Sequence, residues 1–216
     1  MIIALSGAKR AGKDTTAEVL VKKHNFEAIA FADPLRELCS DIFSIPRSTF
    51  TDDNLKEKQF DETRYITNLD IGNIIEYLET NYKYTITDEQ IVSMSKFVGS
   101  EIKNPRNLLQ IVGTEIIRGC VDDKIFIKKV EERIKSCEKN VVITDARFSA
   151  ERSFLRSLGA TMVLIKRPDY PTFKDLHVSE NELGSEDEYN VIITNNDTIY
   201  KLQSEVDIWY TLTVRR

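Results

Sequence analysis

Residues 1–16 read Met-Ile-Ile-Ala-Leu-Ser-Gly-Ala-Lys-Arg-Ala-Gly-Lys-Asp-Thr-Thr, a short apolar run followed directly by a glycine loop. The run 1–5 is rich in β-branched residues, so it predicts a buried strand that turns at Gly7 and continues as a helix near Lys13. Gly7 and Gly12 allow backbone conformations closed to other residues, so N–H groups can converge on phosphate oxygens, and Lys13 adds positive charge. This pattern predicts a phosphate-binding loop for a nucleoside triphosphate.

Asp14 departs from the usual form of such a loop, in which Ser or Thr follows the lysine. The hydroxyl at that position ordinarily ligates Mg²⁺. Aspartate cannot do so in the same way, so the candidate ligands here are Thr15 or a water held by Asp14. The alternative interpretation is a strand-to-helix turn that binds nothing.

Composition limits the classes of protein to which the chain can belong. At 216 residues and 41% hydrophobic content, one α/β domain with an insertion fits the length. A net charge of −5 and a pI near 5.3 give no overall attraction to nucleic acid or an anionic membrane. We therefore expect a small phosphorylated ligand, with no nucleic-acid polymer and no membrane as partner.

The cysteines and the apolar run 1–5 indicate the cellular compartment of the protein. Cys39, Cys120 and Cys137 are odd in number and widely spaced, which favours reduced thiols over disulfides or a standard zinc site. The apolar run is too short for a signal peptide or a membrane span. We expect a cytoplasmic protein, and the oligomeric state stays open between a monomer and a homodimer.

Short apolar runs alternate with helical stretches along the chain. Continuous apolarity predicts strands that are covered on both faces, and hence a parallel sheet in a doubly wound α/β fold. The predicted strands are 1–5, 28–31, 141–143, 162–165 and 191–193. The predicted helices are 13–23, 34–42, 122–137, 150–158 and 198–210.

The gap between the second and third strands is too long for a simple crossover. We predict a core domain of 1–43 and 140–216 and an inserted helical subdomain of 44–139. Within the insertion, 52–64 is dense in mixed charge and is interpreted as a solvated face or a loop without chemistry. Thr87-Asp-Glu-Gln90 has the pattern of a capping box.

The helix that begins at Asn104-Pro105 has two different faces at 100° per residue. Its apolar positions form a predicted buried stripe: Leu108, Leu109, Val112 and Ile116. Its other face carries Arg106, Gln110, Gly113, Thr114 and Arg118. A mid-helix glycine costs about 1 kcal/mol relative to alanine, which suggests close approach of a ligand or of backbone. The two arginines could bind one phosphate between their guanidinium groups. The alternative is that this face is an ordinary surface face.

The run 141–143 ends in Thr144-Asp145, and parallel strands end at one crevice of the sheet. Asp145 is therefore a candidate for the Mg²⁺ site beside Lys13, and Arg147 for neutralising charge on a transferred phosphoryl group. After the fourth strand, the polar segment of about 167–189 is predicted to be a lid that contributes Arg167. His177, within it, is interpreted as structural, because an anionic phosphate oxygen needs no base. Asn195, after the last strand, is a helix-cap or adenine-side candidate.

Five motifs together resemble the deoxynucleoside monophosphate kinases of bacteriophages over nearly the whole chain. They are the loop 7–16, Phe31-Ala-Asp-Pro-Leu-Arg36, Leu109-Gln110 with Gly113-Thr114 and Arg118, Asp145-Ala-Arg147-Phe148, and His177-Val-Ser179-Glu180. The Lys-Asp-Thr ending at 13–15 separates this group from dephospho-coenzyme A kinases, which the chain otherwise resembles in layout. The resemblance implies a three-layer P-loop kinase fold with a five-stranded parallel sheet in the order 2-3-1-4-5, a helical monophosphate-binding insertion and a short lid.

The resemblance also implies ATP-dependent, in-line phosphorylation of deoxynucleoside monophosphates to diphosphates, which are precursors for phage DNA synthesis in the host cytoplasm. ATP phosphates would be bound by Gly7, Lys9, Arg10, Ala11, Gly12, Lys13, Asp14, Thr15, Thr16 and Asn195. Mg²⁺ would be bound by Asp14, Thr15 and Asp145. The catalytic residues would be Lys13, Asp145, Arg147 and Arg167. The acceptor side would comprise Asp33, Arg36, Arg106, Gln110, Gly113, Thr114, Arg118 and Glu151, with Glu151 orienting Arg147.

Two departures from the family pattern leave base preference open. Phe126 replaces an expected tryptophan, and Ala146-Arg-Phe-Ser-Ala-Glu151 differs from Val-Arg-Phe-Pro-Asn-Glu. One rival hypothesis is a dephospho-coenzyme A kinase or another small-molecule kinase. A second rival, from another class, is a P-loop switch that binds ATP without transferring phosphate.

Overall fold

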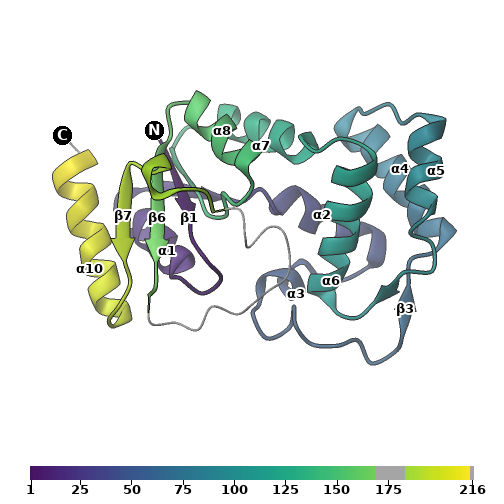
Figure 1. The fold of residues 1–216 in the computed structure, drawn as a ribbon, viewed down its shortest axis with the longest axis horizontal. Coiled ribbons are helices and arrows are strands. Elements are labelled where there is room, and N and C mark those ends of the chain that lie inside the picture. Colours follow the sequence, from purple (N-terminus) through teal and green to yellow (C-terminus); the bar gives the residue numbers. More distant parts are fainter. Residues whose placement is uncertain (169–182, 215–216) are drawn as a thin grey trace. The chain divides into compact units, whose positions relative to one another are not determined.

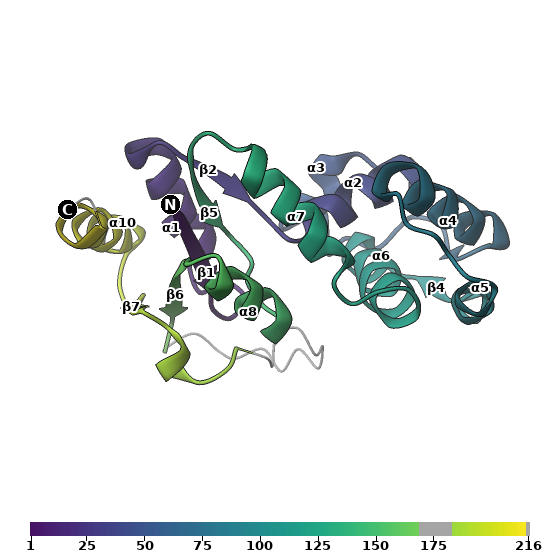
Figure 2. The same cartoon turned by 90° about the horizontal axis from the view of Figure 1, so that it is seen from above.

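The computed structural model describes residues 1–168 and 183–214, which Figures 1 and 2 show in two views. The chain divides into two compact units, each with its own hydrophobic core. The first unit consists of Met1–Phe31 and Val130–Arg216, and the second of Ala32–Lys129.

The first unit is built on a five-stranded parallel sheet. Its strands are β1 (Ile2–Ser6), β2 (Phe26–Ile29), β5 (Asn140–Ile143), β6 (Thr161–Lys166) and β7 (Val191–Thr194). They lie in the order β2-β5-β1-β6-β7, and every neighbouring pair is parallel. Numbered along the chain, this is 2-3-1-4-5, so the predicted sheet order is confirmed. The central β1 is bordered by β5 and β6, whose apolar runs are buried as a parallel sheet requires.

Helices cover both faces of this sheet. α1 (Lys13–His24) and α10 (Ile199–Trp209) pack against each other on one face, and α8 (Ser149–Ser157) lies on the other (Figure 2). The core contains fully buried side chains from strands and helices alike, among them Ile3, Leu20 and Val206. The predicted three-layer α/β architecture is thus confirmed. A 3₁₀ turn, η2 (Glu186–Glu188), precedes β7, and a π-helical turn, η3 (Tyr210–Val214), follows α10.

The second unit is mainly helical. It contains α2 (Asp33–Phe43), α3 (Arg47–Thr51), α4 (Asn68–Tyr82), α5 (Asp88–Ser95), α6 (Pro105–Gln110) and the π-helix η1 (Ile111–Arg118). A two-stranded antiparallel sheet joins β3 (Arg64–Tyr65) to β4 (Glu101–Ile102). The predicted capping box is present, because the Thr87 hydroxyl accepts from the Gln90 N–H and the Gln90 side chain accepts from the Thr87 N–H.

The second unit begins earlier than the predicted insertion, at Ala32 instead of 44. Helix α2 accounts for the difference, because its Leu38 and Cys39 are fully buried in the same core as Ile74 of α4 and Phe126 of α7 (Ile125–Ser136). The unit also ends earlier, at Lys129, within α7. The unit to which a helix belongs depends on the hydrophobic core that it helps to form. The lengths of the sequence segments between predicted strands do not show this.

Candidate functional site

The loop between β1 and α1 surrounds the amino group of Lys13. Its Nζ donates hydrogen bonds to the carbonyl oxygens of Gly7 and Ala8, both at 2.8 Å, and the residue is only 8% exposed. Lys13 is also the first residue of α1, where the helix dipole is positive and backbone N–H groups lack helical partners. A lysine and a helix N-terminus that share one loop form a site for an anion.

Two positions of the loop require glycine. Gly7 has φ +147°, and a Cβ there would lie 2.4 Å from the carbonyl oxygen of Ile165 in β6. Gly12 has φ +111°, and its Cβ would lie 2.8 Å from both Asn195 Nδ2 and Leu202 Cδ2. Positive φ and close backbone approach both exclude a side chain, so the two glycines predicted from the motif are explained by geometry.

Asn195 supports the loop from the end of β7. Its Nδ2 donates to the carbonyl oxygen of Ala11 at 2.8 Å, and the residue is buried. The backbone N–H of Asn195 donates to the carbonyl oxygen of Lys166 at 2.6 Å. Asn195 is a predicted nucleotide contact, and its hydrogen bond to Ala11 also gives it a role in holding the loop's backbone.

The residues after Lys13 differ in their access to solvent. Asp14 is exposed and Thr15 is half-buried. Thr16 is wholly buried, and its hydroxyl donates to the carbonyl oxygen of Gly12 at 3.1 Å. Asp14 and Thr15 therefore remain the candidates on this helix for the metal site, whereas Thr16 stabilises the first turn.

Arg167 reaches the same loop from the end of β6. Its Nη1 donates to the carbonyl oxygen of Arg10 at 3.3 Å, and Arg10 has φ +61°. This hydrogen bond links Arg167 to the phosphate-binding loop, and the residue is exposed. The predicted lid of about 167–189 lies partly outside the described residues. His177, which belongs to it, lies outside them.

Asp145 follows β5, as the motif predicted. Its Oδ1 accepts a hydrogen bond from the backbone N–H of Phe31 at 2.7 Å. Ser6, at the end of β1, donates through Oγ to the carbonyl oxygen of Ala146 at 2.6 Å. These bonds join the ends of three neighbouring strands. Ser6 was not predicted from the sequence, because a serine between an apolar run and a glycine loop has no distinguishing pattern.

Glu151 holds the backbone of Arg147. Its Oε2 accepts hydrogen bonds from the N–H groups of Arg147 at 3.0 Å and Phe148 at 3.1 Å, and Glu151 is 1% exposed. Glu151 lies in the first turn of α8, where a carboxylate is favoured by the helix dipole. These two hydrogen bonds reach the backbone of Arg147, and the orientation of its side chain by Glu151 stays a prediction.

The remaining acceptor candidates all lie in the second unit. Asp33 and Arg36, both in the first turn of α2, form an ion pair of 3.0 Å, and Arg47 lies 3.6 Å from the same carboxylate oxygen. Nε of Arg36 is buried and lacks a hydrogen-bond partner among the residues that the structure describes. A buried donor of this kind is costly unless it is paired, so Arg36 is suited to receive an anionic ligand.

The two arginines of the 104–118 helix have different contacts in the described chain, and their shared binding of one phosphate stays a prediction. Arg106 Nε lies 2.9 Å from Glu57 Oε1, and the Arg118 guanidinium lies 5.4 Å from the centre of the Phe126 ring. The reason is local geometry, because regular α-helix ends at Gln110 and η1 continues with π-helical hydrogen bonds. A face assigned at 100° per residue is displaced along a π-helix.

Packing within this helix also accounts for Gly113. The residue is buried, and a Cβ there would lie 2.3 Å from Leu35 Cδ2 of α2. The close approach inferred from this glycine is therefore that of a core side chain, and its role as a ligand contact stays a prediction. Leu108, Val112 and Ile116 are fully buried as expected, Leu109 is half-buried, and Gln110 and Thr114 stay partly exposed.

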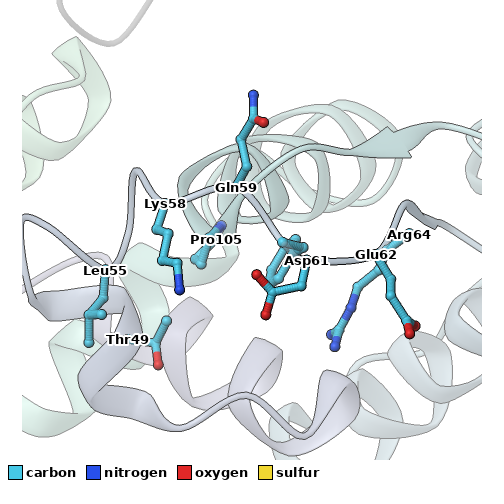
Figure 3. A pocket seen from close by; sticks show the side chains of 9 residues that line it. Thr49, Leu55, Lys58, Gln59, Asp61, Glu62, Arg64 and Pro105 are labelled. Atoms are coloured by element: carbon cyan, nitrogen blue, oxygen red, sulfur yellow. The ribbon is translucent and has the colours of Figure 1, made fainter.

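A pocket of about 340 Å³ lies in the second unit, beside the segment 52–64 (Figure 3). Lys58, Asp61 and Arg64 point toward it, whereas Gln59 points away. Pro105, next to Arg106, forms part of its wall. No chemistry was predicted for the segment 52–64, and the pocket lining mixes the cations Lys58 and Arg64 with the carboxylates of Asp61 and Glu62. That mixture does not select a phosphate over other polar groups.

Two further properties of the described residues bear on partners. No group of three or more His, Cys, Asp and Glu side chains within 1–168 and 183–214 is arranged to hold a metal ion by itself. In the same ranges, no helix has both the length and the apolar character needed to cross a membrane.

Comparison with known proteins shows the family to which the chain belongs. The chain matches the profile of the family described as deoxynucleotide monophosphate kinase over residues 1–206. The deoxynucleotide monophosphate kinase of Enterobacteria phage T4 is 24% identical, and the alignment covers 95% of this chain and 96% of that protein. A protein of Acanthamoeba polyphaga mimivirus assigned to the same activity is 29% identical, with 95% and 94% covered.

Among solved structures, a dephospho-CoA kinase from Campylobacter jejuni aligns with a TM-score of 0.41 at 13% identity, covering 97% of this chain and 95% of that one. This likeness is too low to bear on function. The family match spans almost the whole chain, including the loop around Lys13, Asp145 and Arg147. The chain therefore belongs to the deoxynucleotide monophosphate kinase family and is a nucleotide kinase.

Proposed function

We propose that the chain transfers the γ-phosphoryl group of ATP directly to the phosphate of a deoxynucleoside monophosphate, giving ADP and a deoxynucleoside diphosphate. The observation that carries this proposal is the buried Lys13 ammonium inside the glycine loop, 2.8 Å from two of its carbonyl oxygens. A deoxynucleoside diphosphate is one phosphorylation away from a DNA precursor, which fits a role in supplying DNA synthesis.

The donor phosphates would bind the N-terminal end of α1. Lys13 and the loop N–H groups supply positive charge, and Asn195 fixes the backbone at Ala11. Arg147 and Arg167 are the proposed partners for charge that develops on the transferred group. Phosphoryl transfer needs positioning and charge neutralisation and no covalent intermediate on the protein. An acceptor phosphate is already anionic, so no general base is required.

Mg²⁺ fits the oxygen donors near the loop. Asp14 and Thr15 are accessible at the start of α1, and Asp145 is held by the Phe31 N–H. Mg²⁺ is usually bound by one or two carboxylates together with substrate phosphates, which suits this small set of side chains. The ion would neutralise phosphate charge during transfer.

The acceptor would use cations of the second unit. Arg36 is the strongest candidate, because its Nε is buried without a partner in the described chain and its Nη1 is held by Asp33. Gln110, Thr114 and Arg118 are partly exposed and remain candidates for the nucleoside part. Arg106 would have to exchange its contact with Glu57 for a phosphate, so its contribution should be smaller.

The decisive experiment is ADP release measured with ATP, Mg²⁺ and each common deoxynucleoside and ribonucleoside monophosphate, with dephospho-coenzyme A in the same panel. We expect turnover with at least one deoxynucleoside monophosphate. Turnover with dephospho-coenzyme A alone would favour the first rival hypothesis. ATP binding without phosphorylation of any acceptor would favour a P-loop switch.

Lys13→Ala tests the assignment of the loop in the same assay. Loss of a buried cation at the transferred phosphates should lower kcat by about a hundredfold or more with the fold retained. Lys22→Ala is the matched control, because Lys22 lies on the same helix with its side chain 71% exposed. Near-normal kcat in Lys13→Ala would contradict the proposal.

A further inference from the structure

A buried arginine adjoins the loop that carries Arg147. Arg152 lies in the first turn of α8, and its side chain is only 3% exposed. Its Nη1 donates to the carbonyl oxygen of Arg147 at 2.6 Å. No motif in the sequence selected Arg152, and the proposed function gives it no role.

The peptide backbone of Arg147 is therefore held on both sides by one helical turn. Glu151 accepts from its N–H at 3.0 Å, and Arg152 donates to its carbonyl oxygen at 2.6 Å. These two residues are adjacent, and their charges are opposite. Together they fix the orientation of the backbone from which the Arg147 side chain extends.

Glu188 compensates the charge of Arg152. Its Oε2 lies 3.4 Å from Arg152 Nε and 2.5 Å from Arg156 Nη2. The hydrogen bond from Arg156 holds the pKa of Glu188 below its ordinary value, so Glu188 is ionised at neutral pH. A buried arginine without such a partner would be strongly destabilising.

The chain before Glu188 wraps closely around this ion pair. Gly184 has φ +72°, and a Cβ there would lie 2.5 Å from Glu188 Oε1 and 2.8 Å from Arg152 Nη2. The Tyr189 hydroxyl donates to the carbonyl oxygen of Leu183 at 2.5 Å and closes the same short segment. The guanidinium of Arg152 is thus enclosed by groups that restrict its position.

We propose that Arg152 is a positioning residue for phosphoryl transfer, which acts by holding the Arg147 backbone while Glu188 holds Arg152. This inference rests on the proposed function, because it assigns to Arg147 a contact with the transferred phosphate. Arginine suits the role better than lysine, because its planar fork donates to the Arg147 carbonyl and to Glu188 at the same time.

The test is a double-mutant cycle in the ADP-release assay with the best acceptor. Arg152→Met removes the donors and keeps an apolar stem, and Arg147→Ala removes the side chain that Arg152 is proposed to position. Because misplacement by about 1 Å can cost a hundredfold in rate, we expect Arg152→Met to lower kcat by about ten- to a hundredfold. The KM for ATP should change less than twofold, because the contacts of Lys13 are unchanged.

In the Arg147→Ala background, Arg152→Met should lower kcat by less than about twofold, since residues that act through one another are not additive. Equal losses of kcat in both backgrounds would mean that Arg152 only supports the fold, and would overturn the proposal. An unchanged kcat in Arg152→Met would overturn it as well. Arg156→Gln is the matched control, because Arg156 contacts Glu188 and has no hydrogen bond to Arg147; its kcat should stay within twofold.

Arg152→Lys covers the case in which Arg152→Met fails to fold. It keeps the charge that pairs with Glu188 but cannot serve both partners, so kcat should fall at least threefold while circular dichroism stays unchanged. A folded Arg152→Lys with the kcat of the wild type would show that the planar guanidinium is not needed, and would overturn the proposal. No ADP release from the unsubstituted chain with any acceptor would instead overturn the proposed function, so the two failures are distinguishable.

Discussion

The carboxylate of Asp145 accepts a hydrogen bond from the backbone N–H of Phe31, with 2.7 Å between Oδ1 and N. Asp145 follows β5 and Phe31 follows β2, so the bond ties together the ends of two neighbouring parallel strands. It fixes the carboxylate at the edge of the sheet from which the loop before Lys13 also leaves. Ligands of open parallel sheets bind at this edge.

Asp145→Asn separates the charge of this residue from its hydrogen bond. The amide oxygen can still accept from Phe31, so the thermal unfolding midpoint should stay within about 2 °C of the wild type. Loss of the negative charge should lower kcat by about tenfold or more and raise the Mg²⁺ concentration needed for half-maximal rate. Titration of activity with Mg²⁺ measures both. An unchanged Mg²⁺ requirement would argue against Asp145 as part of the metal site.

Asn195→Ala tests the support that β7 gives to the loop. It removes the donor to Ala11 and leaves a buried carbonyl oxygen unpaired, which costs about 1–3 kcal/mol. We expect a lower free energy of unfolding in denaturant and a raised KM for ATP. The neighbouring Asn196 is exposed, so Asn196→Ala is the control and should change neither. If Asn195→Ala and Asn196→Ala have the same free energy of unfolding and the same KM for ATP, Asn195 does not stabilise the loop.

Gly113→Ala should destabilise the second unit by about 1–3 kcal/mol, because the new Cβ would overlap Leu35 Cδ2. Gly72→Ala provides a control of opposite sign. Outside its own helix backbone and chain neighbours, a Cβ at Gly72 would meet no atom of the described residues within 4 Å. Gly72 is in the interior of α4, so alanine there should stabilise by up to about 1 kcal/mol. Chemical denaturation measures both changes. A neutral Gly113→Ala would mean that Leu35 can move aside easily.

Asp122→Asn tests the pH dependence of stability. Burial alone would raise the pKa of Asp122, but hydrogen bonds from Tyr84, the Lys124 N–H and Lys128 outweigh it and lower the pKa to about 2. A lowered pKa in the folded state stabilises the protein above the ordinary value of 3.8, and this contribution is lost as pH falls toward about 2.

The free energy of unfolding of Asp122→Asn should therefore lie below that of the wild type by about 1 kcal/mol at pH 7. The difference should shrink between pH 4 and pH 2. Urea denaturation across this range gives the comparison. A difference that is the same at both ends of the range would show that the ionised form of Asp122 is not the one being stabilised.

The sheet was predictable because its strands are continuous apolar runs that end in recognisable residues. Gly7 after β1 and Asp145 after β5 mark the functional edge, and the order 2-3-1-4-5 followed from a family resemblance. The ends of the strands were harder to predict than their order. The second strand was expected at 28–31 and lies at Phe26–Ile29, because its pairing with β5 is set by register and not by hydrophobicity alone.

The second unit was harder to predict for two physical reasons. Helix α2 belongs to it through tertiary packing of Leu38 and Cys39, which no local pattern reveals. The π-helical geometry of η1 displaces side chains from the faces that a 3.6-residue period assigns, so Arg106 and Arg118 have separate partners. Glu151 was recognised from its family motif, whereas Arg152 depends on Glu188, which lies 36 residues further along the chain.

The hydrogen bond between Asn195 and Ala11 joins residues 184 positions apart. A ribosome makes the phosphate-binding loop first, yet β5, β6 and Asn195, which hold it, emerge only after most of the chain has been translated. A nascent N-terminal fragment would therefore carry the loop's residues without its shape. Nucleotide affinity should be acquired late in synthesis, and a premature stop before residue 195 should yield a fragment that does not compete with the full-length enzyme for ATP.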